Sequence, residues 1–293
     1  MANYIEEVAT DIDQISVGDS ILVGDLNSLQ VYRTKFNNSL KILVQNIRSL
    51  NKNFTDFEVF LARCKVNYDV IVLTECWLQY NNNVPELESF RHFSTTRYLN
   101  QNSGVVVYVR ENLKYVHVYE PMIDDCDCLV VKIDDSYSMI CVYRSPSFVS
   151  VTNFLNSLDS LLFNIKQIPN IIMIGDININ ISKDNNDHRT DEYLDNLAMH
   201  GLYSSHFLPT RDKSCLDHCL VKSKNKVLTL VCESSLTDHN TLHVEVDLTH
   251  NSNSIKTVNS SYRRLDYHAI ETNLQENNWT DFLKITDRQI KKK

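Results

Sequence analysis

The chain has 293 residues, of which 29 are Lys or Arg and 37 are Asp or Glu, so its formal net charge at pH 7 is −8. Averaged over the whole chain, this balance gives no electrostatic signal for nucleic-acid binding, which depends on Lys and Arg displacing counterions from phosphates. With 43% hydrophobic and 23% charged residues, the composition excludes a disordered or fibrous chain and fits one globular domain with extensions.

The first part of the chain changes character at about residue 41. Residues 1–40 are predicted to form a polar, acidic N-terminal extension with one short apolar stretch at 21–23. A strand is expected at 41–46, a helix at 54–65 with its apolar residues largely on one face, and a second strand at 69–75. Strand, helix and strand in close succession build a sheet with a helix on its face.

Further short apolar stretches predict strands along the rest of the domain, at 104–110, 128–133, 137–143, 170–175, 216–221, 227–231 and 241–246. Helical periodicity appears at about 150–165 and 190–200. The last strand alternates Leu242, Val244 and Val246 with polar residues, a period that suits a sheet covered on one face. We therefore expect an α/β fold of two packed, mixed sheets with helices outside.

The end of the chain is predicted to form a separate part. A polar linker begins after about residue 247, and a helical pattern follows at about 265–283. We therefore divide the chain into an extension at 1–40, a main globular domain at 41–248, and a linker with a helical tail at 249–293.

The sequence shows no membrane or secretion signal. No apolar run approaches the roughly 18 residues that a membrane-spanning helix needs, and the start MANYIEEVATDID lacks the basic and apolar parts of a signal peptide. We expect no membrane partner and an intracellular location. The eight cysteines contain no C-x-x-C pair, which indicates buried, reduced side chains rather than a zinc site or disulfide framework.

Polar side chains stand where several predicted strands end. Asp176 and Asn178 follow the apolar stretch 170–175, and alternate residues of an extended segment point the same way, so both can face one site. Taken alone, this segment is equally compatible with a turn. The other polar groups at or near strand ends are Asn46, Glu75, Asp217-His218 and Thr237-Asp238-His239.

These residue types predict a phosphoryl-transfer site with a hard cation. The set is rich in oxygen and lacks thiolate, which favours Mg²⁺, with Mn²⁺ as an alternative, over zinc. Hydrolysis of a phosphate ester needs a polarised phosphoryl oxygen, an activated water and donors for the developing charge. A cation held by carboxylates, a further carboxylate as base, and a His with Asn donors would meet these needs.

Five motifs follow one another along the chain: Asn46, Glu75, GDIN at 175–178, Leu216-Asp217-His218 and Thr237-Asp238-His239. Their order resembles that of the endonuclease/exonuclease/phosphatase superfamily. The intervening sequence resembles the apurinic-type endonuclease of LINE-type non-LTR retrotransposons over about residues 41–247, in NIRSLNKNF (46–54), VIVLTECWL (70–78), SGVVVYVRENL (103–113), VYRSPS (142–147) and LPTRDKSCLDHCLV (208–221). The resemblance implies a DNase I-like, four-layered α/β sandwich.

The resemblance also implies a role for each motif residue. Glu75 would be the principal metal ligand, with Asn46 beside it, and Asp238 would complete the metal and water side. Asp176 would deprotonate the attacking water and Asn178 would hold the phosphate. His239, oriented by Asp217, would donate to the phosphoryl oxygens. Tyr143 and Thr210 match positions that contact the phosphate in this branch.

Several features lie outside these motifs. Thr237 stands where the family usually has Ser, and a second tetrapeptide, GDLN at 24–27, has no place in the family's order. His218 is expected to pack or hydrogen-bond locally. Arg144 and Arg211 fall in or beside predicted loops, as do Arg97, Arg110 and Lys213, and could either clamp a DNA backbone or be ordinary solvated charges.

The tail beginning YRRLDYHAIETNL resembles the segment that joins endonuclease to reverse transcriptase in these elements. We therefore expect a reverse-transcriptase domain as a C-terminal partner, or a truncated or host-retained copy.

Three functions remain open from the sequence. The first is a Mg²⁺-dependent DNA endonuclease that nicks one strand to leave a 3′-hydroxyl for target-primed reverse transcription, located in the nucleus or cytoplasm. The second is a phosphomonoesterase or phospholipid hydrolase of the same superfamily. The third is a decayed or domesticated copy that acts as a non-catalytic binding module.

Overall fold

The computed structural model describes residues 19–248 apart from 25, 27–28, 30–37, 79–82, 135 and 186. The chain divides into two compact units, 1–251 and 252–293, and all described residues belong to the first. The predicted helical tail at 265–283 therefore lies outside the described residues, as do Asp25 and Asn27 of the second GDLN segment.

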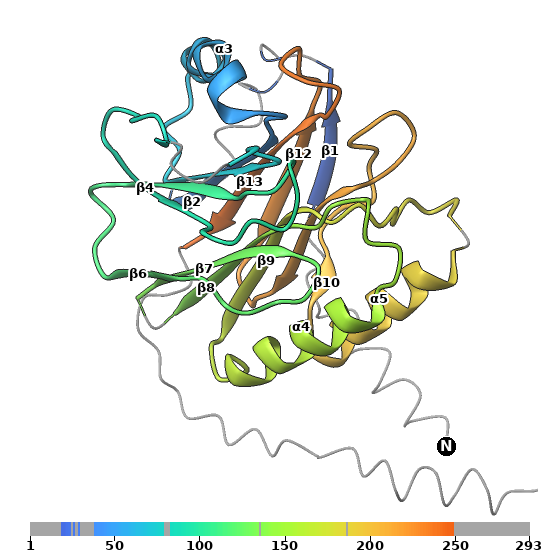
Figure 1. The fold of residues 1–293 in the computed structure, drawn as a ribbon. Helices are drawn as coiled ribbons and strands as arrows, with labels where there is room; N and C mark the ends of the chain where they lie inside the picture. The colour runs from blue at the N-terminus through green and yellow to red at the C-terminus, as the bar shows by residue number, and fades with distance from the viewer. Residues whose placement is uncertain are drawn as a thin grey trace, which may run out of the picture. The chain divides into compact units, whose positions relative to one another are not determined.

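Two mixed β-sheets form the centre of the domain (Figure 1). The seven-stranded sheet has the order β1 (Asp19–Val23), β12 (Val227–Cys232), β13 (Thr241–Asp247), β2 (Ser39–Asn46), β3 (Val70–Thr74), β5 (Val106–Arg110), β4 (Phe90–Ser94). The six-stranded sheet has the order β10 (Tyr203–Ser204), β11 (Asp217–Lys222), β9 (Asn170–Asp176), β8 (Tyr137–Tyr143), β7 (Asp127–Ile133), β6 (Val116–Tyr119).

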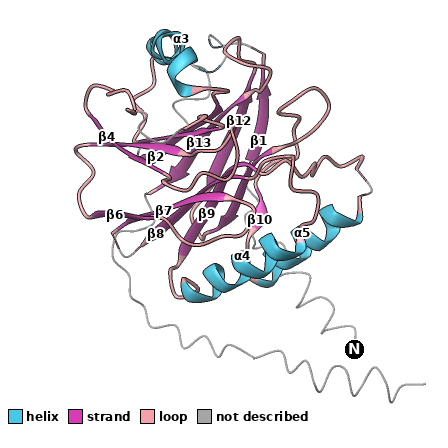
Figure 2. Ribbon diagram, viewed as in Figure 1, coloured by secondary structure: helices cyan, strands magenta, loops and turns pink. Residues whose placement is uncertain are grey.

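Helices cover the outer face of each sheet, as Figure 2 shows in cyan against the magenta strands. Helix α3 (Leu50–Cys64) packs Phe57 and its neighbours onto the seven-stranded sheet. Helices α4 (Thr152–Asn164) and α5 (His188–Met199) pack onto the six-stranded sheet through residues such as Phe154 and Tyr193. A third apolar core lies between the sheets. The predicted four-layered sandwich is confirmed.

Strand β13 corrects the expectation that its sheet is covered on one face. All seven residues of β13 are buried, including the polar His243 and Glu245 between the apolar positions. The outer face of this strand is covered because the chain after α3 lies on it, and the Tyr68 hydroxyl is 2.5 Å from Nδ1 of His243. Alternate residues of β13 therefore face two different buried environments, rather than the core on one side and water on the other.

Four strands were not predicted: β1, β4, β6 and β10. Strand β1 lies within the predicted N-terminal extension, yet it pairs in parallel with β12, with Ile21 opposite Leu230. All four lie at a sheet edge. An edge strand has only one neighbour and need not carry a continuous apolar run, so it leaves a weak signal in the sequence.

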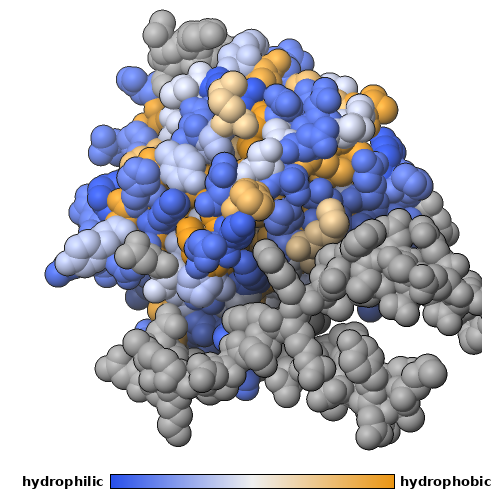
Figure 3. Space-filling model, turned by 90° about the horizontal axis from the view of Figure 1, so that it is seen from below, coloured by the Kyte–Doolittle hydropathy of each residue, from blue (hydrophilic) through white to orange (hydrophobic). Residues whose placement is uncertain are grey.

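The remaining expectations concern the cysteines and the membrane. All eight cysteines are buried, as predicted. Within the described ranges, none of the helices has the length and apolar character needed to cross a bilayer. The coloured part of the face seen in Figure 3 is mostly hydrophilic with scattered apolar side chains.

Gly175 in β9 is required by close contact between strands. Its φ is +138°, and a Cβ added there would lie 2.0 Å from the carbonyl oxygen of Val142 in β8. Gly175 precedes Asp176, so a side chain at this position would push β8 and β9 apart where the polar strand ends meet.

Gly175→Ala is therefore expected to lower the free energy of unfolding by about 3 kcal/mol or more, because neither strand can move without breaking the sheet. Gly24→Ala is the matched control, since a Cβ there meets nothing within 4 Å, and its effect should stay within about 0.5 kcal/mol. Urea denaturation measures both. Equal stability of the two variants would contradict the packing argument.

Candidate active site

Three polar side chains form a row across the six-stranded sheet. Asp176 is the last residue of β9, and its register partners are Tyr143 at the end of β8 and Asp217 at the start of β11. Residues directly opposite one another on neighbouring strands share a face of the sheet. Tyr143 belongs to the core between the sheets, so the row lies at one end of that inner space.

The seven-stranded sheet contributes Asn46, at the end of β2, and Glu75, directly after β3. The Asn46 side-chain amide donates to Oε2 of Glu75 and to Oδ2 of Asp176, both at 2.8 Å. One buried amide group thus joins carboxylates from the two sheets. The convergence that the strand-end pattern suggested is present.

Backbone turns in an unfavourable conformation shape this end of the sandwich. Arg48, Ser49, Glu75, Trp77 and Asn178 have φ values of 43°, 86°, 54°, 55° and 55°. A non-glycine residue in the left-handed region costs about 1 to 3 kcal/mol and persists only where surrounding contacts fix it. One such contact is the bond from Ser49 N to Glu75 O at 2.9 Å. Unfavourable turns therefore cluster around the converging carboxylates.

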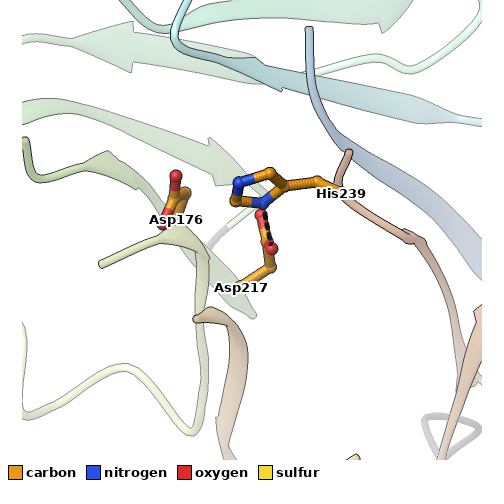
Figure 4. Close-up of side chains that lie close together, drawn as sticks. All are labelled: Asp176, Asp217 and His239. Carbon is orange, nitrogen blue, oxygen red and sulfur yellow. Dashed lines mark hydrogen bonds and ion pairs between the residues drawn. The ribbon is translucent and has the colours of Figure 1, made fainter. Parts of the chain in front are cut away.

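His239 lies between two carboxylates, as Figure 4 shows. Nδ1 is 2.8 Å from Oδ2 of Asp217, and the opposite edge of the ring faces Asp176. Burial alone would lower the pKa of His239, but the charge and hydrogen bond of Asp217 outweigh it and raise the pKa to about 9, with Asp176 and Asp238 adding to the effect. His239 is therefore a cation at neutral pH and can donate to an anion.

The environment of Asp176 leaves its charge incompletely compensated. Burial, and then the charge of Asp217, raise the pKa of the Asp176 carboxyl well above its usual range, against the smaller opposing effects of His239 and Asn46. A carboxyl group in this position retains its proton more readily than one in water, and a nearby cation would favour the ionised form instead.

Two buried polar atoms in the site lack a hydrogen-bond partner among the described residues: the Tyr143 hydroxyl and Oδ1 of Asp217. Burial, together with the charges of Glu75 and Asp176, keeps the pKa of Tyr143 above its usual range, so the hydroxyl remains a donor. Buried polar atoms without partners are rare and often mark a place for a ligand.

The donor set fits a hard divalent cation. Ligand atoms of Asp176, Asp217 and His239 lie within 4.8 Å of one another. Because His239 is protonated and bound to Asp217, it is a poor metal ligand. The carboxylate oxygens of Glu75 and Asp176 could hold the ion instead, and they match the ligands that Mg²⁺ prefers. The amide nitrogen of Asn46 faces these carboxylates and its oxygen accepts from Arg48 N at 3.2 Å, so Asn46 would reach the ion only after its amide group turns over.

A family model described as the Endonuclease/Exonuclease/phosphatase family matches residues 31–239. The chain belongs to this family. A search of curated proteins found no match. Among solved structures, a family protein from Leptotrichia buccalis C-1013-b has a TM-score of 0.54 and 14% identity, covering 71% of this chain and 99% of that one. The Xenopus laevis APE2 catalytic domain has a TM-score of 0.53 and 12% identity, covering 71% and 92%.

These likenesses support the DNase I-like fold. Membership of the endonuclease/exonuclease/phosphatase family indicates a hydrolase, and the family generally uses a divalent metal. Among the described residues, the buried cluster of Asp176, Asp217 and His239 is a place where such chemistry is available.

Asp238 was predicted to complete the metal side of this family site, but its contacts differ. Arg48 donates to Oδ1 and Arg211 pairs with Oδ2, each at 2.8 Å, and the side chain is 38% exposed. Although burial alone would raise the pKa of Asp238, the two guanidinium groups hold it below its usual range. Both oxygens are thus paired with guanidinium groups, so Asp238 holds the two arginines in place, and its part in metal binding stays a prediction.

Two residues predicted to contact substrate are instead directed inward. The Thr210 hydroxyl is fully buried and accepts hydrogen bonds from the backbone N–H groups of Leu216 and Asp217, both at 3.0 Å, so it positions Asp217. Arg144 is 2% exposed and its guanidinium donates to the carbonyls of Phe148 and Ser150. In this structure both side chains are buried and shape loops, so a contact of either with phosphate or DNA stays a prediction.

The other basic and polar residues of the predicted site differ in exposure and in hydrogen bonding. Arg211 stands at the rim with its side chain 40% exposed. Arg97 and Arg110 donate to main-chain carbonyls. The Asn178 amide donates to the Arg144 carbonyl at 2.9 Å, which fixes it beside Asp176. His218 is buried against Tyr193, so the expected local hydrogen bonding is present.

Gln45 is a site residue that the sequence did not reveal. Its buried amide donates to the Asn46 carbonyl at 2.8 Å and to the Thr237 hydroxyl at 3.1 Å, and its Oε1 accepts from the Thr241 hydroxyl. It connects the strand end that carries Asn46 with the loop that carries His239. Its place beside Asn46 was the only available signal, because Gln has no characteristic chemistry at a strand end.

The Asp217–His239 pair gives a pH-dependent prediction. The folded-state pKa of His239, about 9, lies above the ordinary value of 6.5, so the pair stabilises the fold fully below about pH 6.5 and loses this contribution as the pH rises through 9. In Asp217→Asn the His239 pKa should fall markedly, as followed by NMR titration of the imidazole.

Asp159→Asn is the control, because Asp159 pairs with His200 in a more exposed position. It should leave the His239 pKa unchanged. An unaltered His239 titration in Asp217→Asn would contradict the assigned electrostatics.

Proposed function

We propose that the chain is a metal-dependent DNA endonuclease that nicks one strand and leaves a 3′-hydroxyl, as target-primed reverse transcription requires. The observation that carries the proposal is the Asn46 amide joining Glu75 and Asp176 beside the protonated His239. The LINE-type sequence motifs and the fold-level likeness to the APE2 catalytic domain support a nucleic-acid substrate over other phosphate esters.

In the proposed mechanism Glu75 would hold Mg²⁺, or Mn²⁺ in its place, together with Asn46 once its amide group has turned over. When bound, the cation would polarise a phosphoryl oxygen and neutralise developing charge. Asp176 removes a proton from the attacking water, a role for which a raised pKa is suited because a general base works best when its pKa lies near the operating pH.

The other site residues stabilise the phosphate. His239, kept protonated and oriented by Asp217, donates to a phosphoryl oxygen, and the buried Tyr143 hydroxyl is available as a second donor. Asn178 lines the same end of β9. Each of these donors strengthens as negative charge accumulates in the transition state.

Arg48 and Arg211 form a positively charged rim around this acidic centre. Their side chains are 45% and 40% exposed, both pair with Asp238, and Arg48 Nε also lies 3.9 Å from Oε1 of Glu75. Guanidinium groups bind phosphates in a bidentate manner, so we assign these two arginines to the DNA backbone on either side of the scissile phosphate. The reverse-transcriptase partner and the nuclear or cytoplasmic location follow from the same proposal.

Nicking of supercoiled plasmid DNA with Mg²⁺ tests the function. Glu75→Ala and Asp176→Ala should each lower the nicking rate at least about 100-fold, because each removes a group needed in the transition state. Glu58→Ala, an exposed acidic residue on α3, should nick like the wild type.

Equal nicking by the wild type and both site variants would exclude the proposal. Turnover of a soluble inositol phosphate without DNA nicking would favour a phosphomonoesterase. Absence of both activities, with DNA still bound, would favour a non-catalytic module.

A further inference from the structure

Trp77 is hydrogen-bonded to Glu75, the candidate metal-binding carboxylate. Its indole N–H donates to Oε1 of Glu75 at 3.2 Å, while Oε2 of Glu75 accepts from Asn46. The Trp77 side chain is nevertheless 37% exposed. The exposed part of the indole thus lies within one hydrogen bond of the carboxylate that is proposed to hold the metal.

The backbone directs Trp77 outward at an energetic cost. Its φ of 55° is rarely adopted by a bulky aromatic residue. On either side the chain is fixed, because Cys76 N donates to Gly104 O at 3.1 Å and Leu78 N donates to Ser103 O at 2.9 Å. Cys76 is buried, and Leu78 fills the space where a Gly104 side chain would lie. The fold buries Cys76, partly buries Leu78 and leaves Trp77 at the surface.

We propose that Trp77 is a stacking platform for the base of the nucleotide adjacent to the scissile phosphate. The inference rests on the proposed nuclease function and assigns a base-binding subsite to it. The base is covalently tethered to the phosphate held beside Glu75, so it comes within reach of the indole face. Stacking on an aromatic face tolerates any base, because every base presents a π surface.

This subsite has a consequence for the form of the substrate. In a perfect duplex each base is already stacked on its neighbours, so a base must leave the stack before it can lie on Trp77. DNA with an unpaired nucleotide next to the cleaved bond should therefore bind better than perfect duplex DNA of the same sequence.

Fluorescence tests the contact without relying on activity. The chain has two tryptophans, so Trp279→Phe leaves Trp77 as the sole indole. A short single-stranded oligonucleotide, added with Ca²⁺ as a hard cation in place of Mg²⁺, should quench this fluorescence, whereas an oligonucleotide of the same length with abasic sugars, or inorganic phosphate, should not. Equal effects of the normal and abasic oligonucleotides would overturn base stacking.

Nicking kinetics separate the two contacts of Trp77. Trp77→Ala should raise KM for DNA with an unpaired nucleotide by about 10-fold or more. Trp77→Phe keeps an aromatic face but loses the N–H group, so KM should stay near the wild-type value while kcat falls. Tyr115→Ala, which truncates an aromatic side chain that is 82% exposed, is the matched control and should change neither constant.

An unchanged KM in Trp77→Ala, with active wild-type enzyme, would overturn the subsite and leave the nuclease function intact. Failure of the wild type to nick any DNA would instead overturn the proposed function, and the subsite with it. Circular dichroism of each variant establishes that the fold is retained.

Discussion

The site depends on holding carboxylates from two sheets close together in a space that excludes water. Glu75 and Asp176 both accept from the Asn46 amide, and Asp176 is buried near Asp217 as well. Like charges at this separation repel, and burial removes the solvent that would screen them. The chain offsets part of this cost by protonating His239 against Asp217, and the remaining negative charge is what a divalent cation would neutralise.

The rest of the domain fixes the positions of these groups. The register of β8, β9 and β11 aligns Tyr143, Asp176 and Asp217, and Gly175 allows β8 to approach β9 closely enough for that row to form. Gln45 links the Asn46 strand end to the loop of His239. Catalytic groups carried on strands rather than on free loops can be held within a fraction of an ångström, as electrostatic catalysis requires.

The sequence was sufficient to locate residues whose place depends on strand ends, such as Asn46, Glu75 and Asp176, because burial of both sheet faces gives long apolar stretches that stop where polar residues begin. It could not show that Arg144 and Thr210 are buried, since a side chain in a loop can point to solvent or inward, and only tertiary contacts decide which. Edge strands such as β4 and β6 were also missed. Each pairs with a single neighbouring strand, so its sequence need not contain a continuous apolar run.

The net charge of −8 does not argue against a nucleic-acid substrate, because several of the acidic residues form the site and others, such as Asp238, hold arginines at its rim. Whether the converging oxygens bind a cation can be measured by anomalous diffraction from crystals soaked in Mn²⁺. We expect one strong peak beside Glu75 and Asn46 that is lost in Glu75→Ala. A peak bound elsewhere, or one that persists unchanged in Glu75→Ala, would contradict it.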